Sequence, residues 1–408
     1  MAYLPLANIL HYKLRSALSA FGIGIGICML VTLSGLSRGT LGEIADRWEA
    51  VDADLIVFPR GWGENASDKS GSALPDRWAD KIRSAHGDIV ERITPIFTWQ
   101  IRLGGQDQLA VGVDSDQWQH LTGGRQLREG RLFDPDKHFA QWIRTRLLTA
   151  SPDSDANEVA EGLSQQDLSD PQHAGLELVI DSRLAAAGHY TLGQTVTTAN
   201  HEWKIVGIVP AGAMARVFMP RQTAQYLFGN GDITKSTLMF VKLRGGADVG
   251  PAARDIGKTT GQDVVPLGRY RGMLMEKFGI MFVYVDAVNV IALVIAFLFI
   301  MITLYTMVLQ RTREIAILKS AGASNFFLLR QVLAESLLLT GAGTAAGAAM
   351  SVGAAWLIQT LRPLLTVTLT PRMLVTAVVV AAAGAIVAAL YPAWRAVRVD
   401  IAEALTLE

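Results

Sequence analysis

AVNVIALVIAFLFIMITLYTMVL, residues 287–309, contains no Asp, Glu, Lys or Arg and consists mainly of apolar side chains. About 20 such residues in a helix are enough to cross the hydrocarbon region of a bilayer. Three further runs share this length and lack of charge, namely Ala17–Leu36, Ser336–Ile358 and Met373–Leu390. One run alone could be a core helix of a soluble protein, but four runs predict a membrane protein with four transmembrane helices.

The composition outside these runs is that of a soluble domain. The whole chain has 408 residues and no formal net charge, with a mean hydropathy of +0.28. Residues 41–282 hold 26 Lys and Arg against 31 Asp and Glu, a balance of −5, and the remainder holds 11 against 6, a balance of +5. This split separates an outer domain from the membrane part, and it does not indicate a nucleic-acid partner.

Chemistry-bearing motifs are missing from the sequence. The chain has one cysteine, Cys28, so an internal disulfide is excluded and a Cys-based metal site is not expected. The seven histidines show no HExxH spacing, and no GxSxG motif occurs. We therefore predict no catalytic, cofactor-binding or metal-binding residue, and no enzymatic activity on this chain.

Basic residues flank the apolar runs on one side of a four-span topology. They are Lys13 and Arg15, then Arg311, Arg313, Lys319 and Arg330, then Arg395 and Arg398. Short loops rich in Lys and Arg stay in the cytoplasm. Both termini and the 310–335 connection are therefore expected in the cytoplasm, with residues 40–282 and 359–372 outside. A cleaved signal peptide is the alternative for the first run, but no small-x-small cleavage pattern follows it, which favours an uncleaved anchor.

The outer domain, residues 40–282, is predicted to be α+β. The expected strands are 53–59, 93–103, 108–113, 176–180, 203–209, 217–219 and 237–243, and the expected helices are 75–85 and 221–228. Gly104-Gly105 predicts a hairpin turn between two of these strands. A polar helix over 42–51 would continue the first membrane helix outward as a stalk.

Two stretches of the outer domain need separate interpretation. Residues 134–175 are a polar insertion, in which 137–148 are predicted as an amphipathic helix and the remainder as an exposed loop with little to bury. It is either a partner-binding arm or, as we favour, a tolerated insertion. Gly229–Ser236, GNGDITKS, differs by one residue from a P-loop, which requires a helix after it. Because a strand is predicted there instead, a nucleotide site is rejected.

Glycine pairs on the first and third runs predict close helix packing. Gly22 with Gly26, and Gly343 with Gly347, each form GxxxG, a spacing that lets helix backbones approach one another. The partner helix could lie in the same bundle or in a second copy of the chain, and glycine is also simply common in membrane helices.

The cytoplasmic connection Gln310–Ser336, QRTREIAILKSAGASNFFLLRQVLAES, predicts a helical elbow. Arg311 and Glu314 pair at i,i+3 on its first helix, Gly322 ends that helix, and Ser324 can cap the next. A structured elbow is what an intracellular partner needs in order to push on two spans together. The predicted docking residues are Arg311, Arg313, Glu314, Ile315, Leu318, Lys319, Gly322, Ala323 and Ser324.

The elbow resembles the REIGILRAIGAS-type signature of FtsX-like permeases, the MacB-related class of ABC transporter membrane subunits. Lys319 stands where the family usually has arginine, and Glu335 matches further on. The other matching positions are Arg313, Glu314, Ile315, Ile317, Leu318, Gly322, Ala323 and Ser324. Residues 7–18 resemble the family's amphipathic entry helix, and 127–133 and 192–196 resemble motifs of its periplasmic core. Pro392–Ala396, which includes Arg395, resembles the family's C-terminal ending, as does Asp400–Leu405, where Asp400 and Glu403 have capping-box spacing.

This resemblance completes the predicted organisation. The parts are 1–16 entry helix, 17–39 first transmembrane helix, 40–282 outer domain, 283–309 second transmembrane helix, 310–324 elbow, 325–358 third transmembrane helix, 359–372 outer loop, 373–391 fourth transmembrane helix and 392–408 cytoplasmic tail. The family implies a bacterial inner-membrane protein with a periplasmic outer domain, paired with a second permease copy or paralogue. Because this sequence has no Walker motifs, ATP and Mg²⁺ are expected on a separate ABC ATPase subunit.

Two functions remain open from the sequence. The first is ATP-driven export or extraction of an amphiphilic substrate, such as a lipid, lipoprotein, peptide or drug, with a periplasmic adaptor and membrane lipids as partners. The second is an FtsX-like signalling scaffold that activates a cell-wall hydrolase and transports nothing. The size of the outer domain resembles the MacB type more than the smaller FtsX type. An ATP-independent receptor would leave the elbow signature unexplained.

Overall fold

The computed structural model describes residues 13–61, 74–133, 176–229 and 232–397. It divides into two compact units: the first is residues 1–40 with 278–408, and the second is residues 41–277. Residues 1–12, 134–175 and 398–408 lie outside the described part, so the polar insertion, most of the entry helix and the tail residues Asp400 and Glu403 lie there too.

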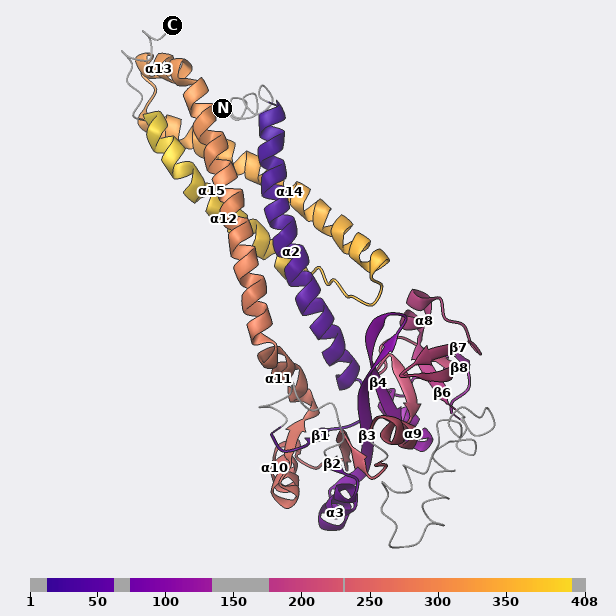
Figure 1. The fold of residues 1–408 in the computed structure, drawn as a ribbon. Coiled ribbons are helices and arrows are strands. Elements are labelled where there is room, and N and C mark those ends of the chain that lie inside the picture. Colours follow the sequence, from indigo (N-terminus) through magenta and orange to yellow (C-terminus); the bar gives the residue numbers. More distant parts are fainter. Residues whose placement is uncertain (1–12, 62–73, 134–175, 230–231, 398–408) are drawn as a thin grey trace, which may run out of the picture. The chain divides into compact units, whose positions relative to one another are not determined.

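The first unit contains the four predicted membrane helices (Figure 1). They are α2 (Lys13–Glu49), α12 (Gly279–Gln310), α14 (Asn325–Leu361) and α15 (Pro371–Val397). Each is long and apolar enough to cross a bilayer. The four-span prediction is therefore confirmed, and α2 extends through the residues predicted as a stalk.

Helix α15 runs further than the sequence predicts. The sequence predicts the fourth membrane helix over 373–391 and the tail from Pro392 onward. A proline also removes one N–H from a helix interior. The helix nevertheless continues to Val397. Ala393 and Ala396, one and four residues beyond the proline, are buried in a cluster with Val308 and Val332. Burial of this last turn offsets the missing hydrogen bond.

The bundle has an apolar core with polar contacts between its helices. The buried core includes Ile23, Ile27, Val31, Ile300, Leu304, Leu339, Ala377, Ala381 and Ala385. The hydroxyls of Ser19 and Thr303 hydrogen-bond between α2 and α12, and Asn289 Nδ2 donates to Ser34 Oγ at 3.0 Å. Such pairs set the register of helices in the membrane, where lipid offers no hydrogen-bonding alternative.

Three chain segments meet at one end of the bundle. The start of α2, the short helix α13 (Thr312–Ser320) and the end of α15 lie there (Figure 1). Lys319 Nζ donates to the carbonyl oxygen of Val397 at 2.5 Å, which joins two of these segments. Residues 362–370, between α14 and α15, lie at the other end, where Thr368 N donates to Gly35 O at 3.1 Å.

The second unit is built on a mixed ten-stranded sheet, counted over the described residues, in the order β12-β1-β11-β3-β4-β9-β6-β8-β5, with β7 also paired to β8. The strands are β1 (Leu55–Phe58), β3 (Val90–Leu103), β4 (Gln106–Val113), β5 (Glu129–Gly130), β6 (Glu177–Asp181), β7 (Thr195–Thr198), β8 (His201–Val209), β9 (Val217–Pro220), β11 (Leu238–Leu243) and β12 (Asp263–Pro266). The pairs β4–β9 and β6–β8 are parallel and the others are antiparallel. The predicted α+β class is confirmed.

Short helices accompany this sheet. They are α3 (Arg77–His86), α4 (Trp118–Leu121), α8 (Ser182–Gly188), α9 (Arg221–Phe228), α10 (Val249–Thr260) and α11 (Tyr270–Lys277). Ile82 of α3 and Ile256 of α10 are buried in one core with Leu55, Met239 and Val241 of the sheet. The sequence analysis did not assign α8, α10, β7 or β12; of these, α10 contributes Ala252, Ala253 and Ile256 to this core.

Gly104 and Gly105 form the predicted hairpin turn, and the stretch that resembles a P-loop leads into strands. Gly104 and Gly105 have φ of +60° and +76° between β3 and β4, and two positive φ angles in succession are the requirement of a type I′ hairpin turn.

The stretch GNGDITKS ends in the short strand β10 (Lys235–Ser236), which pairs with β2 (Leu74–Pro75). The strand β11 begins two residues later. The element directly after it is the strand β11 and not the helix that a P-loop requires, so a P-loop is excluded.

Candidate docking site at the helical elbow

The elbow is two helices joined by a tight turn. Helix α13 ends at Ser320, and Gly322 adopts φ of +93°, a conformation that favours glycine. The N–H of Ala323 donates to Leu318 O at 2.9 Å and that of Gly322 donates to Lys319 O at 3.0 Å. These bonds form a Schellman motif, which satisfies the last carbonyls of the helix.

Helix α14 begins directly after this turn. The Ser324 hydroxyl accepts a hydrogen bond from Phe327 N at 3.2 Å, as an N-cap does. The whole reversal from α13 to α14 therefore takes four residues, Ala321 to Ser324, and its backbone groups are hydrogen-bonded locally. The elbow is a defined structure rather than a loose loop.

One side of α13 faces the bundle. Ala316 is fully buried, and Ile315 packs against the cluster that contains Val308 and Ala396. Leu318 lines a pocket beneath the helix. Ile315 and Leu318, which the sequence placed in the docking set as one apolar face, therefore hold α13 against the bundle.

The opposite side is open and combines charge with apolar surface. On α13, Arg313 and Glu314 are exposed and Ile317 exposes 51% of its surface. Phe326, in the first turn of α14, exposes 72%. The sequence analysis did not include these two apolar residues in the docking set. Once Ile315 and Leu318 define the buried stripe, Ile317 falls outside it on a 100° helical wheel, and this offset is the signal that could have identified it. We call Arg313, Glu314, Ile317 and Phe326 the docking face.

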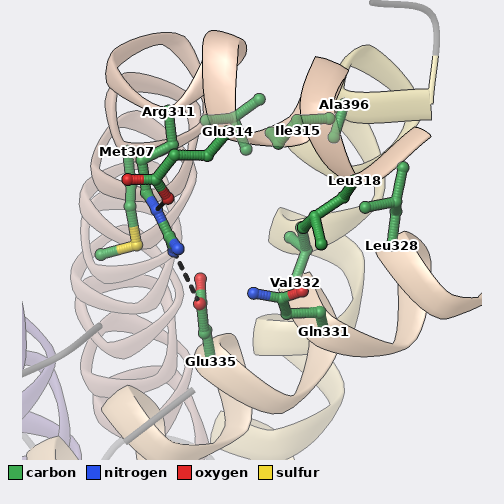
Figure 2. A pocket seen from close by; sticks show the side chains of 11 residues that line it. Met307, Arg311, Glu314, Ile315, Leu318, Leu328, Gln331, Val332, Glu335 and Ala396 are labelled. Atoms are coloured by element: carbon green, nitrogen blue, oxygen red, sulfur yellow. Dashed lines mark hydrogen bonds and ion pairs between the residues drawn. The ribbon is translucent and has the colours of Figure 1, made fainter. Parts of the chain in front are cut away.

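Arg311, at the start of the elbow, contacts carboxylates of both α13 and α14. Arg311 Nε donates to Glu314 Oε2 at 2.7 Å, and Arg311 Nη1 lies 3.4 Å from Glu335 Oε1. Figure 2 shows this guanidinium pointing toward Glu335 in the pocket. The pocket is small, with a volume of about 30 Å³. It is lined by Met307, Val308, Arg311, Glu314, Ile315, Leu318, Leu328, Gln331, Val332, Glu335 and Ala396.

The predicted C-terminal contact residues are only partly described. Arg395 is exposed on the last turn of α15, whereas Asp400 and Glu403 lie outside the described residues. Lys319 of the elbow contacts the end of the same helix through Val397 O. The described part of the tail thus belongs to the elbow region.

The GxxxG glycines lie at contacts between helices of this chain. A Cβ on Gly26 would lie 3.0 Å from the Ala296 side chain of α12, and one on Gly343 would lie 2.7 Å from the Ile23 side chain of α2. Gly22 likewise faces α12, and Gly347 faces α2. The two pairs thus pack within the bundle but not against each other. Gly24, which the sequence analysis did not select, supplies the surface that faces Gly343 and Gly347.

A second cluster of charges lies in the other unit, where the last turns of α2 contact β6 and α8. Glu43 pairs with Arg47 at 2.7 Å, Arg183 at 3.1 Å and Arg216 at 3.2 Å. Arg47 also contacts Asp181 at 3.1 Å, whose other oxygen caps α8 through Leu184 N. We call Glu43, Arg47, Asp181, Arg183 and Arg216 the ionic cluster.

The electrostatics of the ionic cluster follow from its burial. Burial lowers the pKa of the Arg216 guanidinium, as does the positive charge of Arg47, while Glu43 and Asp181 raise it. Asp181 is fully buried and Arg47 nearly so. Buried charges of this kind need each other as partners. The cluster holds residues 43–47 of α2 to the sheet unit.

Metal binding has no support in the described part of the chain. Across residues 13–61, 74–133, 176–229 and 232–397, no group of three or more His, Cys, Asp or Glu side chains is arranged to hold a metal ion.

Two family models match this chain. Residues 16–141 and 144–259 match the MacB-like periplasmic core domain, and residues 287–401 match the C-terminal part of FtsX-like permeases. The first match covers more than half of the chain and corresponds to α2 and the sheet unit. The second corresponds to α12–α15 and contains the elbow.

Curated relatives agree with these models. The "Macrolide export ATP-binding/permease protein MacB 2" of Yersinia pestis bv. Antiqua (strain Antiqua) is 22% identical, over 97% of this chain and 56% of its own length. The MacB protein of Burkholderia thailandensis is 23% identical, over 86% of this chain and 51% of its own length. The chain thus spans little more than half the length of these relatives.

A solved structure is also similar over the outer domain. The periplasmic region of MacB from Actinobacillus actinomycetemcomitans is 12% identical, with a TM-score of 0.36, and the match covers 55% of this chain and 94% of that one. This similarity is too distant to add to the family models. From the two family models, the chain belongs to the MacB-like, FtsX-related family of ABC transporter permeases.

Proposed function

We propose that this chain is the membrane subunit of an ABC transporter, and that a separate ATPase subunit, carrying ATP and Mg²⁺, binds its docking face. The exposed apolar surface of Ile317 and Phe326, beside Arg313 and Glu314, is the observation that carries this proposal. Apolar and aromatic anchors with a charged rim are typical of protein interfaces.

Orientation in the membrane supports the same proposal. The start of α2, the elbow and the end of α15 share one end of the bundle (Figure 1). The basic residues Arg311, Arg313, Lys319 and Arg395 belong to this end, and short segments rich in Lys and Arg stay in the cytoplasm. We therefore propose that this end lies in the cytoplasm of a bacterial cell, and that residues 41–277 lie in the periplasm.

The elbow can pass a movement to both of its neighbours. Helix α13 follows α12 after one residue and leads into α14 through the Schellman turn. A displacement of α13 by an ATPase is thus applied to two membrane helices together. Chain continuity makes α2 and α12 the covalent routes from the bundle to residues 41–277. We propose that ATP hydrolysis moves the outer domain in this way, in a pair of permease subunits.

The substrate is proposed as an amphiphilic molecule that is exported or extracted, with a periplasmic adaptor as partner. The curated relatives carry macrolide export in their names, and the MacB-like core accounts for the sheet unit. The FtsX-like match covers only the membrane part, so the signalling-scaffold alternative receives less support. Hydrolysis stimulated by an amphiphile in liposomes that lack any cell-wall enzyme would contradict the scaffold.

The docking face can be tested by truncating its aromatic anchor. The tagged full chain is purified from its native membranes, and ABC ATPases bound to it are identified by mass spectrometry. For Phe326→Ala we expect ATPase affinity to fall by a factor of about 30, about 2 kcal/mol, the value of an interface hot spot. Binding is measured with both proteins, the permease in nanodiscs.

A matched control lies on the same helix. Leu337 of α14 is also an exposed large apolar residue, 44% accessible, but it lies outside the docking face. Leu337→Ala should leave ATPase affinity unchanged. Equal affinities for Phe326→Ala and the unmodified chain, or the absence of any ABC ATPase in the purified material, would show that the docking face is wrongly assigned.

A further inference from the structure

We propose that Arg311 and Glu335 form a polar strut that sets the angle of α13 against α14, so that Arg311 acts as a positioning residue for the docking face. This proposal rests on the proposed function in one respect, because the positioning role assumes that an ATPase binds the docking face. The geometry of the strut, however, is a property of this chain alone and can be tested without a partner.

The backbone at Arg311 is the point where the elbow angle is defined. Arg311 alone separates α12, which ends at Gln310, from α13, which begins at Thr312. Its φ of −109° and ψ of 17° lie outside the helical region. A junction of one residue leaves two backbone torsions to adjust. The direction of α13 must therefore be held by contacts elsewhere.

Packing holds α13 on only part of its inner side. Ala316 and Ile315 pack against the bundle, but a small pocket of about 30 Å³ lies between α13, the end of α12 and the start of α14. Side chains that line a void lose packing contacts on that side. Here a polar contact spans the space instead, as Figure 2 shows for Arg311 and Glu335.

The two charges are shielded enough for their attraction to matter. The side chains of Arg311 and Glu335 are only 14% and 6% exposed. Pairs in such surroundings interact more strongly than the exposed pairs of a protein surface. The planar guanidinium also restricts the direction from which it can meet a carboxylate. The pair can therefore hold both the distance and the orientation of the junction.

The same guanidinium is joined to the docking face. Glu314, which is 61% exposed, accepts from Arg311 Nε at 2.7 Å. A cationic group of a partner that engages Glu314 would thus compete with Arg311 for this carboxylate. Arg311 then links the occupancy of the docking face to the strut. This connection distinguishes a positioning role from a contact that only stabilises the fold.

The test measures the elbow angle in the permease alone. Spin labels are placed at exposed Ser320, on α13, and exposed Trp356, on α14, in a Cys28→Ser background in nanodiscs. The variant R311M/E335M removes both charges of the pair together, so neither remains buried without the other, and we expect it to stay folded. The Ser320–Trp356 distance distribution should become broader or shift relative to that of the unmodified pair.

Conservative and positional controls complete the design. Arg311→Lys keeps the charge and should restore most of the original distribution, while Arg330→Met removes an exposed cation of α14 that lies outside the pocket lining and should change nothing. Arg311→Met alone leaves Glu335 without this cation and is compared for thermal stability only. An unchanged distance distribution in R311M/E335M would overturn the strut.

A second readout separates the strut from the proposed function. If the ATPase binds the unmodified permease, R311M/E335M should lose about tenfold in affinity, equivalent to about 1.4 kcal/mol. A changed distance distribution with unchanged affinity would refute the positioning role while leaving the docking face intact. If no ATPase binds the unmodified chain, the docking proposal fails, and the distance measurement still decides whether Arg311 and Glu335 set the elbow angle.

Discussion

Replacement of Arg47 with methionine is expected to destabilise the sheet unit by about 3–5 kcal/mol, the cost of removing one member of a buried ion pair. Arg47 contacts Glu43 and the fully buried Asp181. Methionine keeps much of the side-chain volume but leaves these carboxylates without their shared cation. The penalty is the desolvation of charges that have lost a partner. The loss should exceed that of any surface substitution in this unit.

The measurement is thermal or chemical unfolding of the full chain, followed by tryptophan fluorescence. Seven of the nine tryptophans lie within residues 41–277, so the signal reports chiefly on this unit. Arg83→Met is the matched control, because Arg83 pairs with Asp80 at 3.1 Å while both side chains are 62–80% exposed. Surface pairs are worth about 0–1 kcal/mol. Similar losses for the two variants would show that the ionic cluster is not buried as described.

Replacement of Gly343 with leucine is expected to destabilise the membrane bundle by about 1–3 kcal/mol or more, the typical cost of overpacking a tight contact. A Cβ at Gly343 would lie 2.7 Å from Ile23 Cβ and 2.9 Å from the carbonyl oxygen of Ala20. The carbonyl belongs to the backbone of α2 and cannot move without that helix. We therefore expect α2 and α14 to separate.

Gly341 provides an internal control on the same helix. A Cβ at Gly341 meets nothing within 4 Å, so Gly341→Leu adds apolar surface toward the surroundings of the bundle without a clash. Both variants gain the same helix propensity. Unfolding of the permease in mixed micelles, followed by circular dichroism, should show a loss for Gly343→Leu only. Equal stability of the two variants would contradict the contact between α2 and α14.

The membrane helices were predictable because their signal is local. Each span needs a run of apolar residues that matches the bilayer thickness, and composition alone reveals it. Their ends were less predictable. The end of α15 lies at Val397, because contacts of Ala393 and Ala396 with α12 and α14 outweigh the local effect of Pro392. Such contacts come from residues far away in the chain.

The elbow shows the same division between local and distant effects. Gly322 and Ser324 act through hydrogen bonds to residues within five positions of themselves, so their roles could be predicted from spacing. Which apolar side chains of the elbow remain exposed depends on which side of α13 packs against the membrane helices. Ile315 was assigned to docking but packs inward, whereas Phe326 is open to a partner.

The sequence alone established the four-span class, the α+β outer domain and the helix–turn–helix of the elbow, because helix length, strand alternation and turn chemistry are properties of neighbouring residues. Only the tertiary structure revealed which face of α13 is free, that Glu335 meets Arg311, and that Asp181 meets Arg47 across 134 positions. The physical reason is that burial and charge pairing depend on distances between segments that chain order does not specify. The elbow residues could thus be identified from the sequence. Only the tertiary contacts divided them into an exposed docking face and the buried pair of Arg311 and Glu335.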